Sequence, residues 1–159
     1  MAQLTLVRID DRLIHGQVVT AWLKSYDSDI IIVTDDGVAK DKFAQRVLKA
    51  AAPQGVAVGA LSVADTLRFF KAPKYASKRV MIIVKGPEAV EGLVDGGVPI
   101  KRVILGGMGK KEGRESLNRN VSASPDEIAC LKRLVEKGVA VEYALVPDDA
   151  PVPLSKIVS

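Results

Sequence analysis

The apolar residues of this 159-residue chain alternate between two periods, and that alternation limits the folds that the chain can adopt. Short runs rich in Val, Ile and Leu have the composition of buried strands. These runs cover residues 4–9, 30–34, 56–61, 80–84, 103–105 and 139–145. The segments between them have helical spacing, and strands that alternate with helices build a parallel sheet. We therefore predict an α/β fold, with an open, mostly parallel, doubly wound sheet and helices on both faces, in one domain over residues 1–159.

The helices themselves are predicted from the faces on which apolar residues recur. The first four faces consist of Val18, Ala21 and Trp22; of Phe43, Val47, Leu48 and Ala51; of Ala64, Leu67 and Phe70; and of Val90, Leu93 and Val94. The last helix has the clearest limits, because Ser124 and Glu127 form a capping box around Pro125. Gly138 then ends it. The tail 147–159 contains three prolines and is predicted to be extended, as an edge element.

Composition excludes several classes of protein. No run of about 18 apolar residues is present, and the amino-terminal segment is not a signal peptide, so we expect a cytoplasmic protein. The net charge of +4 suits an anionic partner, but 4% aromatic residues are too few for a base-stacking surface, so no nucleic-acid partner is expected. The single cysteine, Cys130, excludes an internal disulfide and a multi-cysteine metal site, and is predicted to be buried.

Chemically active side chains are densest in residues 10–17, directly after the first predicted strand. Ligands of α/β sheets bind beyond the carboxyl ends of the strands. The only histidine, His15, falls where the first helix begins, and free N–H groups and a positive dipole end are found there. A neutral imidazole can act as a nucleophile, and a carboxylate bonded to its other nitrogen fixes the tautomer. The loop therefore favours phosphoryl chemistry on His15, with a capping or buried structural histidine as the equal alternative.

The segment RIDDRLIHGQV, at 8–18, resembles the active-site motif of the IIB component of the mannose/fructose/sorbose family of the phosphoenolpyruvate-dependent sugar phosphotransferase system. Residues 35–43, 51–58 and 96–108 resemble the same family. The length and the strand–helix order are similar to one complete IIB domain of this type.

The resemblance implies that His15 accepts a phosphoryl group, at Nδ1, from a IIA phosphohistidine. It would then pass the group to a sugar that enters through the IIC and IID membrane components. Asp10 would orient the imidazole, Arg12 would bind the phosphoryl oxygens, and Gly16 and Gln17 would offer backbone N–H groups. The implied protein needs no metal or organic cofactor and is peripherally associated with its membrane transporter.

Several alternatives remain open at this stage. The runner-up function is a non-catalytic α/β domain whose His15 loop senses phosphate or another ligand. Arg8 is expected to serve the strand structurally, and Asp11 to be a loop charge or a cap. The glycine-rich loop 106–114 is either a flexible surface loop or a docking and phosphate-binding element. Residues 101–119 have a local charge of +4 and are predicted to flank the His15 loop and to steer an anionic partner.

Overall fold

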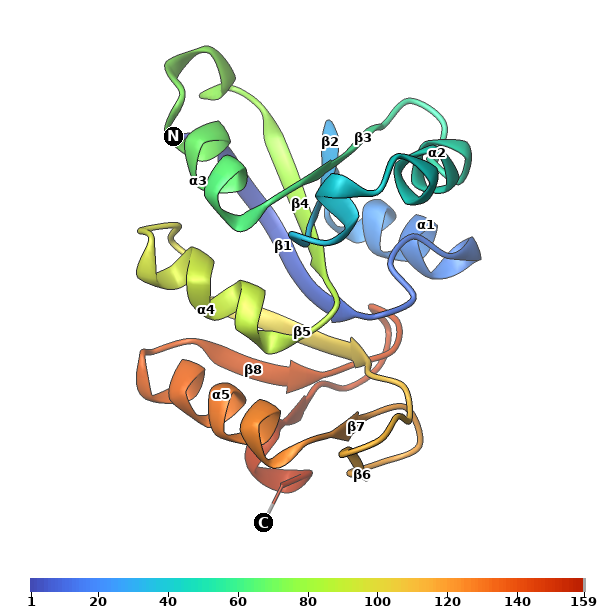
Figure 1. Ribbon diagram of the computed structural model, residues 1–159, viewed down its shortest axis with the longest axis vertical. Coiled ribbons are helices and arrows are strands. Elements are labelled where there is room, and N and C mark those ends of the chain that lie inside the picture. Colours follow the sequence, from blue (N-terminus) through green and yellow to red (C-terminus); the bar gives the residue numbers. More distant parts are fainter. Residues whose placement is uncertain (159) are drawn as a thin grey trace.

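The computed structural model describes residues 1–158 and contains a seven-stranded sheet in the order β3-β2-β4-β1-β5-β8-β9 (Figure 1). The strands are β1 (Gln3–Asp10), β2 (Ile30–Thr34), β3 (Ala57–Leu61), β4 (Arg79–Val84), β5 (Arg102–Gly107), β8 (Ala140–Tyr143) and β9 (Val152–Pro153). Every neighbouring pair is parallel except β8 and β9. The predicted parallel sheet is confirmed, and β9 is the edge element expected in the tail. The predicted domain extends to Ser159, which lies outside the described residues.

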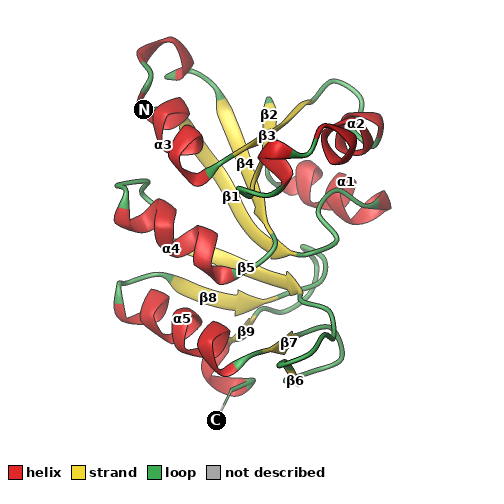
Figure 2. Cartoon of the chain, in the orientation of Figure 1, coloured by secondary structure: helices red, strands yellow, loops and turns green. Residues whose placement is uncertain are grey.

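Helices cover both faces of the sheet, as a doubly wound fold requires (Figure 2). The helices α1 (Gly16–Ser25) and α2 (Lys42–Ala50) pack on one face, and α3 (Val63–Lys71), α4 (Pro87–Asp95) and α5 (Pro125–Glu136) pack on the other. None of the helices in residues 1–158 is long and apolar enough to cross a membrane.

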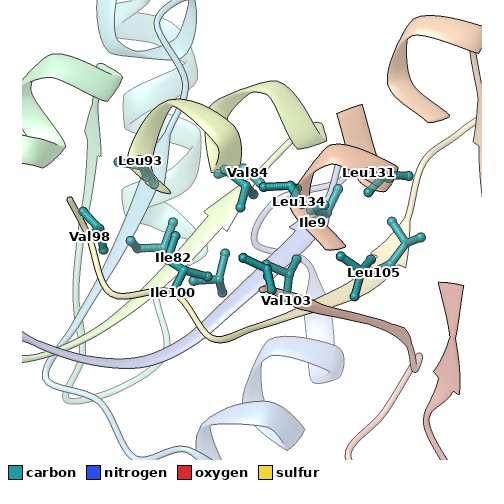
Figure 3. Packing of buried hydrophobic residues seen from close by; sticks show 14 of the residues in the cluster. Ile9, Ile82, Val84, Leu93, Val98, Ile100, Val103, Leu105, Leu131 and Leu134 are labelled. Carbon is teal, nitrogen blue, oxygen red and sulfur yellow. The ribbon is translucent and has the colours of Figure 1, made fainter. Parts of the chain in front are cut away.

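The core consists of two buried layers, one on each face, because side chains of a strand alternate between faces. On β1, Val7 and Ile9 join the larger layer with Leu105 and Leu131 (Figure 3), whereas Leu6 joins the smaller layer. The smaller layer also contains the buried residues of α1 and α2, such as Trp22 and Leu48. The central strands β1, β4 and β5 are therefore buried on both sides, which explains their near-continuous apolar sequences.

The order of the strands creates a switch point between β1 and β5. The chain leaves β1 through α1 toward β2, but it leaves β5 in the opposite direction toward β8. Since β1 and β5 are neighbours, the loops after them diverge to opposite sides and leave a crevice at the carboxyl edge. The loop 10–15 follows β1, so this crevice lies at the predicted functional residues.

Local predictions for the first helices were partly wrong. Phe43 and Val47 are 69% and 52% exposed, although they were expected to share a buried face with Leu48. The reason is that α2 covers β3, the edge strand of the sheet, so that nothing lies beyond its outer side. On α3, Thr66 and Phe70 are buried, whereas Ala64 is exposed.

The carboxyl-terminal third agrees more closely with the sequence. Ser124 and Glu127 form the predicted capping box of α5, and Gly138 adopts a φ of +91° after the helix. A short hairpin of β6 (Glu115–Ser116) and β7 (Ser122–Ala123) was not predicted, since two-residue strands leave no periodic signal. The strand β5 runs two residues beyond the predicted 103–105, so Gly106 and Gly107 belong to the sheet rather than to a loop.

Candidate functional site

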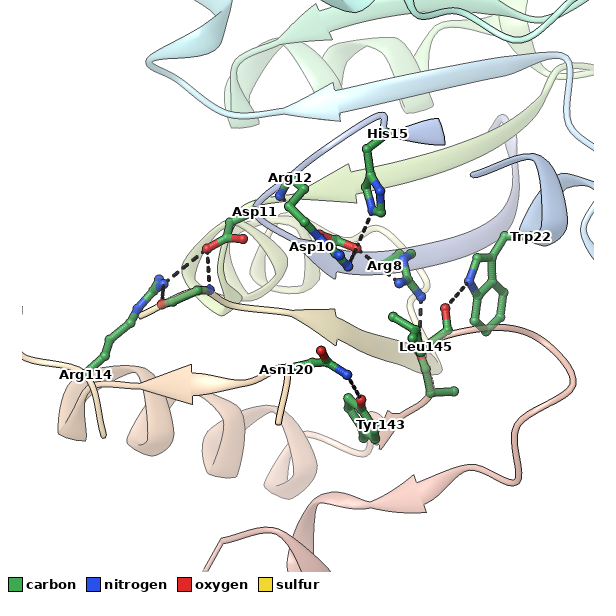
Figure 4. A network of polar contacts seen from close by, with 12 residues as sticks. Arg8, Asp10, Asp11, Arg12, His15, Trp22, Arg114, Asn120, Tyr143 and Leu145 are labelled. Carbon is green, nitrogen blue, oxygen red and sulfur yellow. Dashed lines mark hydrogen bonds and ion pairs between the residues drawn. The ribbon is translucent and has the colours of Figure 1, made fainter. Parts of the chain in front are cut away.

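Asp10, the last residue of β1, is the centre of the site (Figure 4). Its buried carboxylate accepts hydrogen bonds from Arg8 Nη2 at 3.1 Å and from Arg12 N at 3.1 Å. Arg12 also donates from Nε to Oδ1 at 3.0 Å and from Nη2 to Oδ2 at 3.0 Å. Burial alone would raise the pKa of Asp10, but the bonds from Arg12 and the charges of both arginines reverse that effect and lower it below its ordinary value. Asp10 is therefore a fixed anion rather than a proton carrier at neutral pH.

His15 lies beside this anion, with Nε2 at 3.2 Å from Asp10 Oδ2. The residue is the N-cap of α1 and has an extended backbone, but its side chain does not cap the helix. Its ring is 27% exposed, and among residues 1–158 it has no hydrogen bond through Nδ1. The structure thus brings His15 to Asp10 and leaves the second ring nitrogen unengaged, which a capping or fully buried histidine would not do.

A tight turn returns the chain from Asp10 to His15. Leu13 N donates to the carbonyl of Asp10 at 2.9 Å, and Leu13 has a φ of +59°. This left-handed conformation is uncommon for a residue with a side chain and stores strain at the loop. Gly16 and Gln17 then occupy the first two positions of α1, are exposed, and present N–H groups that have no partner within the helix.

The residue that the sequence analysis undervalued is Arg8. It is buried, donates from Nη1 to the carbonyl of Ala144 at 3.2 Å, and lies over the Trp22 ring with Cζ 5.1 Å from the centroid. Together with its bond to Asp10, these contacts place a buried cation directly behind the anion that contacts His15. A signal was present, because a charge inside a strand predicted to be buried on both faces needs a buried partner.

The glycines at the end of β5 make room for these arginines. A Cβ on Gly106 would collide with the Arg8 guanidinium. A Cβ on Gly107 would lie 3.1 Å from Arg12 Nη2 and 3.3 Å from Asp10 Oδ1. These glycines were predicted to let the backbone approach a phosphate, but the groups that they admit are side chains of the site itself.

Asp11 connects the loop after β1 to the loop after β5. Its Oδ2 accepts from Gly109 N at 2.7 Å and from Arg114 Nη1 at 3.3 Å. Arg114 also donates to both carboxylate oxygens of Glu127, each at 2.8 Å, and its side chain is only 5% exposed. These bonds hold the two loops of the switch point together, so Asp11 is neither a solvated charge nor a helix cap.

The prediction that the basic segment 101–119 flanks the His15 loop is confirmed only for the part after β5, where Gly109 and Arg114 contact Asp11. Arg102 and the lysine before it lie at the amino end of β5, whereas the His15 loop lies at the carboxyl edge. The charge of Arg114 is already neutralised within ion pairs. Lys110 and Lys111 remain exposed in the loop after β5. A local sum of charges could not distinguish the two ends of one strand.

No three His, Cys, Asp or Glu side chains are grouped as metal ligands within residues 1–158. The site brings together one imidazole, one buried carboxylate and two guanidinium groups. An imidazole fixed through one nitrogen and open at the other can act as a nucleophile toward phosphorus. The exposed guanidinium and the N–H groups of α1 are suited to the oxygens of a phosphoryl group.

Comparison with known proteins identifies the family. The family model for the PTS system sorbose subfamily IIB component matches residues 4–159. The fructose-specific EIIB component of Bacillus subtilis (strain 168) is 36% identical, covering 94% of this chain and 92% of that protein. The mannose-specific EIIAB component of Escherichia coli (strain K12) is 40% identical over 97% of this chain. The chain spans about half, 48%, of the length of that relative.

Solved structures agree with the sequence comparison. The IIBSor domain of the sorbose permease from Klebsiella pneumoniae has a TM-score of 0.94 at 34% identity, covering 97% of this chain and 94% of that one. The N-acetylgalactosamine-specific IIB component 1 from Escherichia coli has a TM-score of 0.86 at 29% identity, covering 94% and 98%. The resemblance inferred from the sequence is confirmed, and the chain belongs to the sorbose subfamily of IIB components of the phosphotransferase system.

Proposed function

We propose that this chain is a phosphocarrier that accepts a phosphoryl group on His15 from a IIA phosphohistidine and transfers it to a sugar. The observation that carries the proposal is the pairing of His15 Nε2 with Asp10 Oδ2, at 3.2 Å, on a ring that is 27% exposed. This pairing directs the Nε2 proton to the carboxylate and leaves the lone pair on Nδ1. Nδ1 is thus the nucleophile that the geometry favours.

In the first transfer, Nδ1 of His15 forms a bond to phosphorus as the donor's nitrogen–phosphorus bond breaks. The electron pair of that bond stays on the donor imidazole. The His15 ring gains positive charge as the new bond forms, and the ionised Asp10 stabilises that charge. In the second transfer, a sugar hydroxyl oxygen bonds to phosphorus and gives its proton to water, while the Nδ1–P bond breaks and its electron pair returns to Nδ1.

Arg12 is suited to hold the phosphoryl oxygens without leaving Asp10. Its side chain is 46% exposed and uses Nε and Nη2 to contact the carboxylate. A guanidinium has five N–H groups, so three remain for an oxyanion. A lysine at this position would supply one point charge and could not bridge the two anions with the same geometry. The first-turn N–H groups of Gly16 and Gln17 would complete the site.

The remaining components follow from membership of the family and are part of this proposal. The donor is a IIA component, the sugar enters through membrane components of the IIC and IID type, and the chain acts in the cytoplasm, peripherally associated with them. The domain comprises residues 1–159 and uses no metal or organic cofactor.

The test is phosphorylation of the purified chain with phosphoenolpyruvate, the general relay proteins and a IIA component. Wild type should acquire one acid-labile, alkali-stable phosphate, and His15→Ala should acquire none. Phosphorus and nitrogen NMR of the product should assign the phosphate to Nδ1. Stable phosphorylation of His15→Ala, or phosphate on Nε2, would contradict the mechanism.

Variants of the neighbouring residues separate a carrier from a sensor. Arg12→Ala should slow transfer by about 10²–10³-fold, as the loss of one preorganised donor does, and Arg12→Lys should restore it only in part. Asp10→Asn should slow transfer while the circular dichroism spectrum stays that of the folded chain. Reversible phosphate binding with no covalent product would instead support the phosphate-sensing alternative.

A further inference from the structure

The outward face of α2 combines two exposed apolar side chains with a concentration of positive charge. Phe43 and Val47, 69% and 52% exposed, are two of the four exposed large hydrophobic residues in the described part of the chain. They lie one turn apart on a helix whose inward side is occupied by Leu48. Lys42, Arg46 and their neighbours Lys40 and Lys49 are exposed as well. We call these six residues the α2 patch: Lys40, Lys42, Phe43, Arg46, Val47 and Lys49.

The cations of the α2 patch have no anionic partner within residues 1–158. Among residues 1–158, none of the ion pairs involves any of the four. The only acid within residues 40–49 is Asp41, which caps α2 by accepting from Ala44 N at 3.0 Å. Four cations and one carboxylate leave a balance of +3 in ten residues, against +4 for the whole chain. The α2 patch is thus a local surplus of positive charge.

The patch is held rigidly. Gln45 Nε2 donates to the carbonyl of Val38 at 3.1 Å and to that of Ala39 at 2.9 Å, which ties α2 to the short helix η1 (Val38–Lys40). Since η1 follows the carboxyl end of β2, it lies at the same edge of the sheet as the His15 loop. Both α1, whose N-cap is His15, and α2 cover the same face of the sheet (Figure 1).

We propose that the α2 patch rests on the anionic surface of a lipid bilayer. Lysine and arginine side chains beside exposed aromatic and aliphatic groups are the composition of helices that lie in the membrane interface. Anionic lipids attract the cations, and Phe43 and Val47 enter the boundary between headgroups and acyl chains. A second copy of this chain is a poorer occupant, because two α2 patches that face each other would repel, each with a charge of +3. The inference deepens the peripheral membrane association proposed above and brings the His15 loop to the membrane side.

The experiment is sedimentation of the full chain with lipid vesicles. Wild type should bind vesicles that contain phosphatidylglycerol, should not bind vesicles of phosphatidylcholine alone, and should be released by salt. Each cation near an anionic leaflet strengthens binding roughly fivefold. Lys42→Gln with Arg46→Gln should therefore weaken binding about 25-fold. The matched control, Lys71→Gln with Lys78→Gln, makes the same change in charge at exposed residues away from α2 and should bind as wild type does.

The apolar half of the patch has its own control. Phe43→Ser should weaken vesicle binding several-fold, whereas Val135→Ser, on α5 and 47% exposed, should not. No binding by wild type, or equal losses in the two double variants, would overturn the proposal. If Lys42→Gln with Arg46→Gln instead slows phosphoryl acceptance from IIA without vesicles, the patch serves that acidic protein partner and the lipid proposal fails.

Vesicle binding and phosphoryl acceptance are separate measurements. A chain that binds vesicles but never acquires phosphate would refute the phosphocarrier function and leave the α2 patch as proposed. A chain that accepts phosphate in solution but does not bind anionic vesicles would refute the proposal for the α2 patch and leave the phosphocarrier function as proposed.

Discussion

Gly106→Ala tests whether the buried Arg8 guanidinium holds the site together. A Cβ on Gly106 would lie 2.8 Å from Arg8 Nε and closer still to Cζ and Nη2. The methyl group therefore fits only if the guanidinium moves. Arg8 is not free to move, because it is buried between Trp22, the carbonyl of Ala144 and Asp10. The added methyl group should therefore break the ion pair between Arg8 and Asp10.

The magnitude follows from the bonds that are lost. Arg8 donates one hydrogen bond to Asp10 and one to the Ala144 carbonyl. Hydrogen bonds to charged groups contribute about 1.5–3 kcal/mol, and breaking a buried ion pair costs about 3–5 kcal/mol. Arg12 still pairs with Asp10 after Arg8 has moved, so the lower end applies. We expect Gly106→Ala to lower the free energy of unfolding by about 3 kcal/mol.

The assay is urea unfolding followed by the fluorescence of Trp22, the single tryptophan, which contacts Arg8 directly. Gly59→Ala in β3 is the matched control, because no heavy atom lies within 4 Å of a Cβ built there. It should leave stability unchanged or raise it by up to about 1 kcal/mol. In an Arg8→Ala background, Gly106→Ala should have no further cost, since the colliding group is gone.

Two results would refute this reasoning. If Gly106→Ala unfolds within about 0.5 kcal/mol of wild type, the guanidinium has an alternative site of equal energy. If the loss is the same with and without Arg8, it arises from the strand backbone and not from the ion pair.

Three further predictions concern titration, reactivity and the connection between the loops. Because the folded environment lowers the pKa of Asp10, the ionised carboxylate stabilises the fold fully above about pH 4, and this stabilisation is lost as the pH falls through the lowered pKa. The free energy of unfolding of Asp10→Asn, measured in urea, should therefore fall less steeply in acid than that of wild type. Burial raises the pKa of Cys130 to about 11, and the charge of Glu91 adds to the effect. Iodoacetamide should therefore modify this thiol only when urea unfolds the chain. Modification in buffer at the rate of a free thiol would contradict this prediction. Arg114→Met leaves Asp11 and Glu127 without their cation. It should lower the free energy of unfolding by about 3 kcal/mol and speed amide exchange in residues 108–114. A change in the free energy of unfolding below about 0.5 kcal/mol would show that the ion pairs are dispensable.

The predicted functional residues converged as a group because they are close in sequence. Asp10, Arg12 and His15 lie within six residues at the end of one strand, so any parallel sheet places them at its carboxyl edge. The position of Arg8 was equally fixed by the alternation of the strand. The role of Arg8 could not be predicted, because it depends on Trp22 and Ala144, which lie 14 and 136 residues away in the chain.

The wrong predictions share a different cause. Phe43 and Val47 were placed on one apolar face with Leu48, because helical periodicity identifies such a face but not whether a second element covers it. The charges of 101–119 were summed as one patch, although the length of strand β5 separates its first cations from its last. Arg114 was counted as a free charge, yet its partners are Asp11 and Glu127 on two other elements.

The sequence by itself determined the α/β class, the parallel sheet, the α5 capping box and the cluster around His15. These features depend on periodicity, local hydrogen bonds and spacing within a few residues, which are properties of a short stretch of chain. Only the tertiary structure decided that β1 and β5 are neighbours, that Gly106 and Gly107 admit two guanidinium groups, and that the pKa of Asp10 is lowered despite burial. Each of these depends on contacts between residues far apart in the chain, because burial and the pKa of a group are set by whatever surrounds it in space.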